Sequence, residues 1–120
     1  MTENSSSSYI LYGIKNCTSV KKARQWLDKH SVTYQFHDFR VDGLTPGQLQ
    51  LFIEHAGWES ILNKRSTSWR QVAEAQKIDL NADKAAALML ANVTLIKRPV
   101  LVAGEQVFIG FNAETYQTLL

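Results

Sequence analysis

The only cysteine of this sequence, Cys17, stands in the stretch YGIKNCTSVKKARQWL at residues 12–27. An apolar run ends just before it, and a pattern with period 3.6 begins just after it, so Cys17 is predicted to lie between a strand and a helix. The first turn of a helix has backbone N–H groups without intrahelical partners, and the helix dipole places partial positive charge there. Both effects favour the thiolate, which is the nucleophilic form of cysteine.

The residues around Cys17 are polar, which argues against a place in the core. Lys15 adds positive charge, while Asn16, Thr18 and the backbone amides around them are expected to stabilise a sulfur anion. The alternative is a buried and chemically inert cysteine, because free cysteine is among the most often buried residue types. The setting favours the first interpretation and predicts thiol–disulfide chemistry at Cys17.

Two strands and a helix are predicted for the N-terminal part of the chain. Residues 8–14 read as a buried strand, residues 19–30 as an amphipathic helix, and residues 34–39 as a second strand. The helix turns Val20, Ala23 and Leu27 to one side. Residues 1–8 are polar and are predicted to form a short disordered tail.

Residues 44–92 are predicted to be helical throughout. Thr45, Pro46 and Gln48 form a capping box with proline at the first helical position, and the helix should end near Gly57. Three further helical segments are predicted in this block. The first is a single turn at residues 58–62, and the second is capped by Ser68 with Gln71 and runs to about Gln76. The third is capped by Asn81 and turns Ala85, Leu88 and Met89 inward.

The C-terminal part of the chain is predicted to be a β-hairpin followed by a helix. Pro99 precedes the strand at 100–102, Gly104-Glu105 forms the turn, and residues 106–109 form the return strand. A last helix is expected to begin after Asn112, with Tyr116 and either Leu119 or Leu120 inward. The order is then β-α-β, a helical block and β-β-α, which is an α/β thioredoxin-like arrangement with a four-stranded mixed sheet. Residues 9–120 are expected to form one domain, with a helical insertion at about 44–92.

Composition narrows the functional classes. The 120 residues carry a formal net charge of +2, too small to argue for nucleic-acid binding, and no apolar stretch approaches the ~20 residues of a membrane span. One cysteine cannot form an internal disulfide, so we expect a cytoplasmic protein. The three histidines are scattered, without the spacing of a metal site.

Several motifs, in order along the chain, carry a family resemblance. They are YGIKNC, VKKARQWL, FHDFRVDGL, the Gly-Trp pair at 57–58, LNKRSTSWR and IKRPV. Together they resemble the ArsC/Spx/YffB family over residues 9–120, and most closely its YffB-like branch of proposed glutathione-dependent thiol reductases. The resemblance implies a thioredoxin-like fold with a helical insertion, in agreement with the predicted order of elements.

The resemblance also implies roles for individual residues. Cys17 corresponds to the family nucleophile, Arg65 and Arg98 correspond to arginines that line the active site, and Pro99 corresponds to a cis proline beside the cysteine. Guanidinium groups suit carboxylates and oxyanions, and glutathione has two carboxylates. We therefore expect a monothiol reductase with no bound cofactor, with glutathione as co-substrate and a small thiol, disulfide or oxyanion as substrate.

Two other functions stay open within the same family. The first is an Spx-like regulatory module that contacts RNA polymerase, although Val20 stands where Spx-type regulators often carry a second cysteine. The second is arsenate reduction, for which family enzymes use a third arginine near the last strand. The corresponding stretch here, VFIGFN, contains no arginine, and this disfavours an arsenate pocket.

Overall fold

The computed structural model describes residues 9–120, and the tail predicted at residues 1–8 lies outside the described residues. The chain divides into two compact units. We call residues 9–43 with Arg98–Leu120 the sheet unit, and Leu44–Lys97 the helical unit. The helical unit extends to Lys97 because its last segment pairs with its own middle: the N–H of Lys97 donates to the carbonyl of Ile61 at 2.8 Å.

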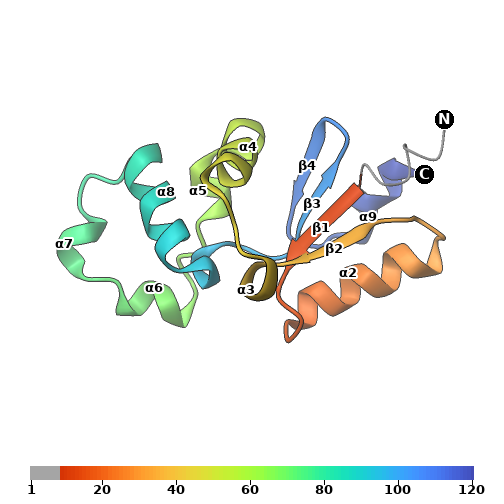
Figure 1. The fold of residues 1–120 in the computed structure, drawn as a ribbon, viewed down its shortest axis with the longest axis horizontal. Coiled ribbons are helices and arrows are strands. Elements are labelled where there is room, and N and C mark those ends of the chain that lie inside the picture. The colour runs from red at the N-terminus through yellow and green to blue at the C-terminus, as the bar shows by residue number, and fades with distance from the viewer. Residues whose placement is uncertain (1–8) are drawn as a thin grey trace. The chain divides into compact units, whose positions relative to one another are not determined.

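The sheet unit contains all the named strands among the described residues. In chain order its elements are β1 (Tyr9–Gly13), α2 (Thr18–Lys29), β2 (Gln35–Asp38), α3 (Phe39–Asp42), β3 (Val100–Ala103), β4 (Gln106–Ile109), α9 (Ala113–Tyr116) and the 3-10 helix η2 (Gln117–Leu119) (Figure 1).

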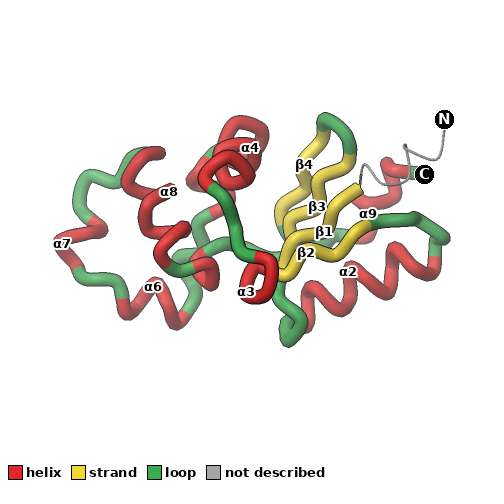
Figure 2. The backbone as a smooth tube through the Cα atoms, in the orientation of Figure 1, coloured by secondary structure: helices red, strands yellow, loops and turns green. Residues whose placement is uncertain are grey.

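The four strands form one mixed sheet in the order β2-β1-β3-β4 (Figure 2). Strand β1 runs parallel to β2 and antiparallel to β3, and β3 pairs antiparallel with β4. The arrangement confirms the predicted thioredoxin-like fold. The register pairs Gly13 with Asp38 and Tyr12 with Val100, so the end of β1, the end of β2 and the start of β3 meet at one edge of the sheet.

Helices α2 and α9 pack on one face of this sheet. Leu11 of β1 and Leu101 of β3 form a fully buried cluster with Ala23 and Leu27 of α2 and Tyr116 of α9. Val20, Ala23 and Leu27 are all 0% exposed, which confirms the inward face predicted for the helix after Cys17. Burial of these apolar side chains stabilises the unit and holds α2 in place.

The hydroxyl of Tyr116 is buried and has no hydrogen-bond partner among residues 9–120. An unpaired buried hydroxyl costs about 1–3 kcal/mol, so we predict that Tyr116→Phe raises the free energy of unfolding by about 1 kcal/mol. Burial also raises the pKa of Tyr116 above its usual 10.0. The unfolded chain therefore ionises first as the pH rises past 10.0, and the wild type loses stability that the variant keeps.

Urea unfolding of wild type and Tyr116→Phe between pH 8 and about pH 11 measures this difference. Tyr9→Phe, at a half-exposed tyrosine of β1, is the matched control. It should change the free energy of unfolding little across this pH range. A Tyr116→Phe protein that is less stable than the wild type at every pH would contradict the prediction.

The helical unit begins with the capping box that was predicted. The Thr45 hydroxyl accepts from the N–H of Gln48, the Gln48 side chain accepts from the N–H of Thr45, and Pro46 opens the helix. The elements of this unit are α4 (Pro46–Ala56), α5 (Trp58–Ile61), α6 (Thr67–Gln71), α7 (Glu74–Lys77), α8 (Ala82–Ala91) and the 3-10 helix η1 (Val93–Leu95). Asn81 caps α8 as predicted, and Ala85 and Met89 are buried there, whereas Leu88 is half-buried.

The prediction of a helix capped by Ser68 is wrong. The cap is Ser66, whose hydroxyl accepts from the N–H of Trp69 at 3.1 Å. The hydroxyl of Ser68 instead pairs with that of Thr94. The helix also stops at Gln71, because the two residues after it take extended backbone angles before the separate α7 begins.

The C-terminal hairpin and last helix follow the predicted order. Gly104 has a φ of 65° in the turn between β3 and β4, a conformation that glycine adopts at little cost. Asn112 caps α9 by accepting from the N–H of Thr115. Leu119 packs against the core of the sheet unit, whereas Leu120 is 59% exposed, which decides between the two leucines.

Within residues 9–120, none of the helices combines the length and the apolar character needed to span a membrane.

Candidate functional site

Cys17 is the N-cap of α2, immediately before the first helical residue. Its carbonyl accepts the first helical hydrogen bond, from the N–H of Lys21 at 2.9 Å, but its side chain makes no capping hydrogen bond. The first turn of α2 contains no acidic side chain, and Cys17 is partly exposed to solvent. A sulfur in this position has helical N–H donors close by and no nearby acidic side chain in that turn to oppose a negative charge.

Asp38, at the end of β2, forms a hydrogen bond with the loop that carries Cys17. The Asp38 carboxylate accepts from the N–H of Lys15 at 3.3 Å and from the N–H of Arg40 at 2.8 Å. Asp38 is 5% exposed, and its own N–H donates to the Asp42 carboxylate at 3.0 Å. The strand register that pairs Gly13 with Asp38 brings this carboxylate close to the loop, which begins just after Gly13. Sequence reasoning missed Asp38, because it lies inside the strand predicted at residues 34–39 and its partners Lys15 and Arg40 are set by the fold.

We predict that Asp38→Asn slows alkylation of Cys17 in the folded protein, although the substitution also lowers the stability of the protein. The amide keeps one acceptor oxygen but loses the charge, so the Lys15 and Arg40 amides are held less firmly and the loop becomes looser. The free energy of unfolding should fall by about 1–2 kcal/mol, and iodoacetamide labelling of folded protein should slow severalfold.

Asp42→Asn is the matched control for this prediction. Asp42 is exposed and its carboxylate accepts from the N–H of Asp38, but it forms no hydrogen bond with residues 14–17 of the Cys17 loop. Equal labelling rates in wild type and Asp38→Asn would show that Asp38 is only a structural cap for α3.

Arg98 and Pro99 stand just before β3, at the sheet edge where β1 ends and the Cys17 loop begins. The Arg98–Pro99 peptide bond is cis, as the family resemblance implied. Pro99 is buried, its carbonyl accepts from the N–H of Gly110 at 2.8 Å, and Arg98 is half-buried. The fold therefore brings three of the predicted site residues, Cys17, Arg98 and Pro99, to one edge of the sheet.

Arg65 belongs to the helical unit, where its side chain is exposed and its N–H donates to the side chain of Asn63 at 3.1 Å. It lines a cavity of about 420 Å³ together with Lys64, Lys97 and Glu59. An isolated β-bridge between Leu62 and Ile96 places these two segments side by side. The two lysines were not among the predicted site residues, because they are 33 positions apart in the chain and come together through the pairing of these two segments.

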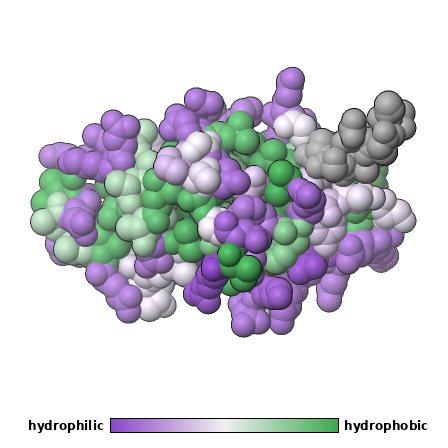
Figure 3. Space-filling view, viewed as in Figure 1, coloured by the Kyte–Doolittle hydropathy of each residue, from purple (hydrophilic) through white to green (hydrophobic). Residues whose placement is uncertain are grey.

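The remaining predicted site residues, Lys15, Asn16 and Thr18, are exposed around Cys17. The outer surface of α2 beyond them is hydrophilic in the space-filling view, in keeping with the charged side chains that its sequence places there (Figure 3). In the part of the chain that the structure describes, no group of three or more His, Cys, Asp or Glu side chains is arranged to hold a metal ion.

Known protein sequences are similar to this chain over almost its whole length. Residues 12–119 match the model of the ArsC family. An uncharacterized protein of Haemophilus influenzae is 44% identical over 107 residues, which cover 89% of this chain and 94% of that protein. The global transcriptional regulator Spx of Streptococcus mutans is 30% identical over 112 residues, which cover 88% of this chain and 77% of the regulator.

Comparison with solved structures agrees with the sequence matches. A YFFB protein is 45% identical with a TM-score of 0.89, and the match covers 92% of this chain and 96% of that one. An arsenate reductase related protein from Brucella melitensis is 39% identical with a TM-score of 0.74, and the match covers 92% of each chain. With the thioredoxin-like sheet and a cysteine at the start of the helix after β1, these matches show that the chain belongs to the ArsC family.

Proposed function

We propose that this protein is a monothiol, glutathione-dependent reductase whose nucleophile is Cys17. The observation that carries the proposal is the place of Cys17, partly exposed at the N-cap of a 12-residue helix whose first turn has no acidic side chain. A helix N-terminus is one of the settings in which proteins place nucleophilic cysteines, because the N–H groups and the dipole stabilise the thiolate. Membership of the ArsC family, and the 39% identity to an arsenate reductase related protein, support thiol chemistry.

The reaction has two exchange steps. The Cys17 thiolate attacks the glutathione sulfur of a mixed disulfide, a new bond forms between Cys17 and glutathione, and the substrate leaves as a thiolate that takes a proton from water. A second glutathione thiolate then attacks the glutathione sulfur on Cys17 and releases glutathione disulfide. Two glutathione molecules supply the two electrons, and no second protein cysteine is needed, in keeping with the single cysteine of this chain.

The predicted site residues have separate roles in this proposal. Arg98, at the same sheet edge as Cys17, binds a carboxylate of glutathione, and Pro99 shapes the surface beside it. Lys15, Asn16 and Thr18, which are exposed and close to Cys17 along the chain, favour its anion. Arg65, in the helical unit, is a second candidate for anion binding and is tested by its own variant.

The test uses the full chain with glutathione disulfide, followed by intact mass. One glutathione adduct should form, and added reduced glutathione should remove it. Turnover of hydroxyethyl disulfide, measured as NADPH oxidation by added glutathione reductase, should exceed the rate with glutathione alone. Arg98→Gln should raise KM about tenfold, the effect of one lost charged hydrogen bond. A protein that forms no adduct and adds nothing to the background rate is not such a reductase.

A regulatory module that contacts RNA polymerase is the second candidate, because the chain is 30% identical to an Spx regulator. Binding of purified protein to the C-terminal domain of the polymerase α-subunit tests it. In that function Cys17→Ser should bind as well as wild type, since Val20 leaves no partner cysteine three residues on for a disulfide switch. Retention on the α-subunit without glutathione turnover would favour this candidate.

A further inference from the structure

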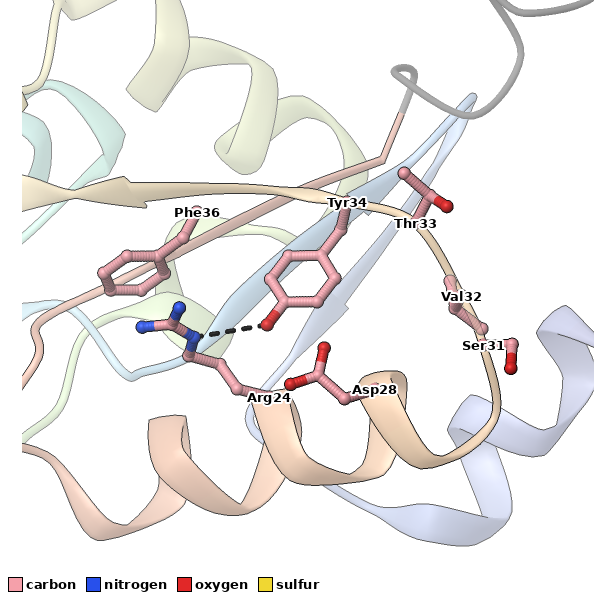
Figure 4. A pocket seen from close by; sticks show the side chains of 7 residues that line it. All are labelled: Arg24, Asp28, Ser31, Val32, Thr33, Tyr34 and Phe36. Carbon is pink, nitrogen blue, oxygen red and sulfur yellow. Dashed lines mark hydrogen bonds between the residues drawn. The ribbon is translucent and has the colours of Figure 1, made fainter.

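A second cavity lies in the sheet unit, on the flank of α2 and away from the cysteine. Its volume is about 560 Å³, within the roughly 300–1,000 Å³ of small-molecule sites. It opens between the C-terminal half of α2 and the segment that leads into β2, which is an edge strand (Figure 4). Arg24, its nearest lining residue on α2, is seven residues after Cys17, or roughly 10 Å along the helix. None of the predicted site residues lines it.

Arg24 is held in a defined orientation in this cavity. The carbon at the centre of its guanidinium lies 4.3 Å from the centroid of the Phe36 ring, and its Nε–H donates to the Tyr34 hydroxyl at 3.2 Å. These contacts use one of the five guanidinium N–H donors and leave the donors of the two terminal nitrogens. No carboxylate among the described residues forms an ion pair or hydrogen bond with Arg24.

Asp28 lines the same cavity and brings the opposite charge. It is four residues after Arg24, a spacing at which the two side chains can pair on a helix. They do not pair here, because the guanidinium is turned onto the two aromatic rings. In Figure 4 the Tyr34 hydroxyl stands between the guanidinium and the Asp28 carboxylate. The cavity therefore presents a fixed cation and a separate anion.

We propose that this cavity binds the zwitterionic head of an α-amino acid. A carboxylate meets the terminal nitrogens of Arg24, and an ammonium meets Asp28. The rings of Tyr34 and Phe36 and the side chain of Val32 form an apolar wall for the rest of the ligand. A simple anion is a poorer match, because the Asp28 carboxylate repels it, and a simple cation is opposed by Arg24 in the same way.

Three small molecules separate the two charges in a binding experiment. L-phenylalanine carries both charges and a ring, 3-phenylpropionate lacks the ammonium, and phenethylamine lacks the carboxylate. Each is titrated at millimolar concentrations into the full-length, isotopically labelled wild type, and amide shifts are followed by NMR. We expect saturable shifts within residues 24–36 for L-phenylalanine, and at least tenfold weaker binding of either analogue.

Variants assign the effect to the two charges. Arg24→Gln and Asp28→Asn should each weaken L-phenylalanine binding about tenfold. Lys29→Gln, on the next residue of the same helix and outside the cavity, is the matched control and should bind as wild type does. Cys17→Ser should also bind normally, which separates this test from that of the reductase.

Several results of these titrations would overturn the proposal. Absence of saturable shifts at these residues would exclude an amino-acid site. Binding of 3-phenylpropionate as tight as that of L-phenylalanine, or no effect of Asp28→Asn, would show an anion site at Arg24 in place of a zwitterion site. Shifts that vanish in Cys17→Ser would place the ligand at the cysteine and not in this cavity.

Discussion

Cys17→Ser is expected to abolish both the glutathione adduct and glutathione-dependent turnover, and to leave a protein at least as stable as the wild type. A serine hydroxyl does not exchange with disulfides, so the proposed first step cannot occur. Serine is, however, among the preferred N-cap residues, and Cys17 stands at the N-cap without a side-chain cap. The free energy of unfolding should therefore rise by about 0.5–1 kcal/mol.

Intact mass, coupled turnover and urea unfolding on the same preparation test the three parts of this prediction. Cys17→Ala removes the sulfur without adding a cap, so it should lose turnover with no gain in stability. A gain in stability with complete loss of turnover shows that the lost activity reflects the missing sulfur and not a damaged fold. If Cys17→Ser keeps full glutathione-dependent turnover, Cys17 is not the nucleophile and the proposed mechanism is wrong.

Gly13→Ala is expected to destabilise the sheet unit by about 1–3 kcal/mol, the usual effect of overpacking a core. Gly13 is the last residue of β1, and α2 packs directly against it. A Cβ at this position would lie 2.6 Å from one methyl carbon of Val20 and 3.3 Å from the other. Val20 is 0% exposed and β-branched on a helix, so it has little freedom to turn away. Helix α2, with Cys17 at its start, must move off the strand.

Urea unfolding of a double-mutant cycle with Val20→Ala checks the cause of this loss. Val20→Ala removes both methyl groups that clash, so the double variant should be more stable than the sum of the two single effects predicts, by about 1 kcal/mol or more. Gly47→Ala is the matched control, because its Cβ would meet only the Thr45 hydroxyl oxygen, at 3.9 Å, on an exposed helical turn. That change should stabilise the protein by about 0.5–1 kcal/mol. A Gly13→Ala protein as stable as wild type would contradict the predicted clash.

The features that could be predicted from the sequence are those set by neighbours along the chain. The capping box at Thr45, the caps at Asn81 and Asn112, and the inward face of α2 depend on residues within about one turn of each other. The N-cap position of Cys17 is of the same kind, because a strand pattern ends and a helix pattern begins around it. The cis bond before Pro99 was expected from the family motif and not from any local pattern.

The same locality explains where sequence reasoning failed. Ser66 and Ser68 both stand near the start of the same predicted helical stretch, and local sequence alone offers either as its cap. In the structure Ser66 is the cap, whereas Ser68 lies inside α6 and its hydroxyl pairs with that of Thr94, 26 positions further along the chain. No periodicity within a short window reports such a partner.

The sequence by itself thus determined the order of the elements, the helix caps and the place of Cys17 at the start of α2, since these depend on short-range backbone preferences. Only the tertiary structure decided which distant groups meet. Strand register placed the Asp38 carboxylate under the Lys15 amide, 23 positions away. Packing of α2 beside the edge strand turned Arg24 onto Phe36 and Tyr34 and left the Asp28 carboxylate, in the same cavity, without an ion-pair partner among residues 9–120. Contacts of this kind form when separate elements pack together. The residues between two such elements in the sequence do not indicate how close the elements will lie in the folded protein.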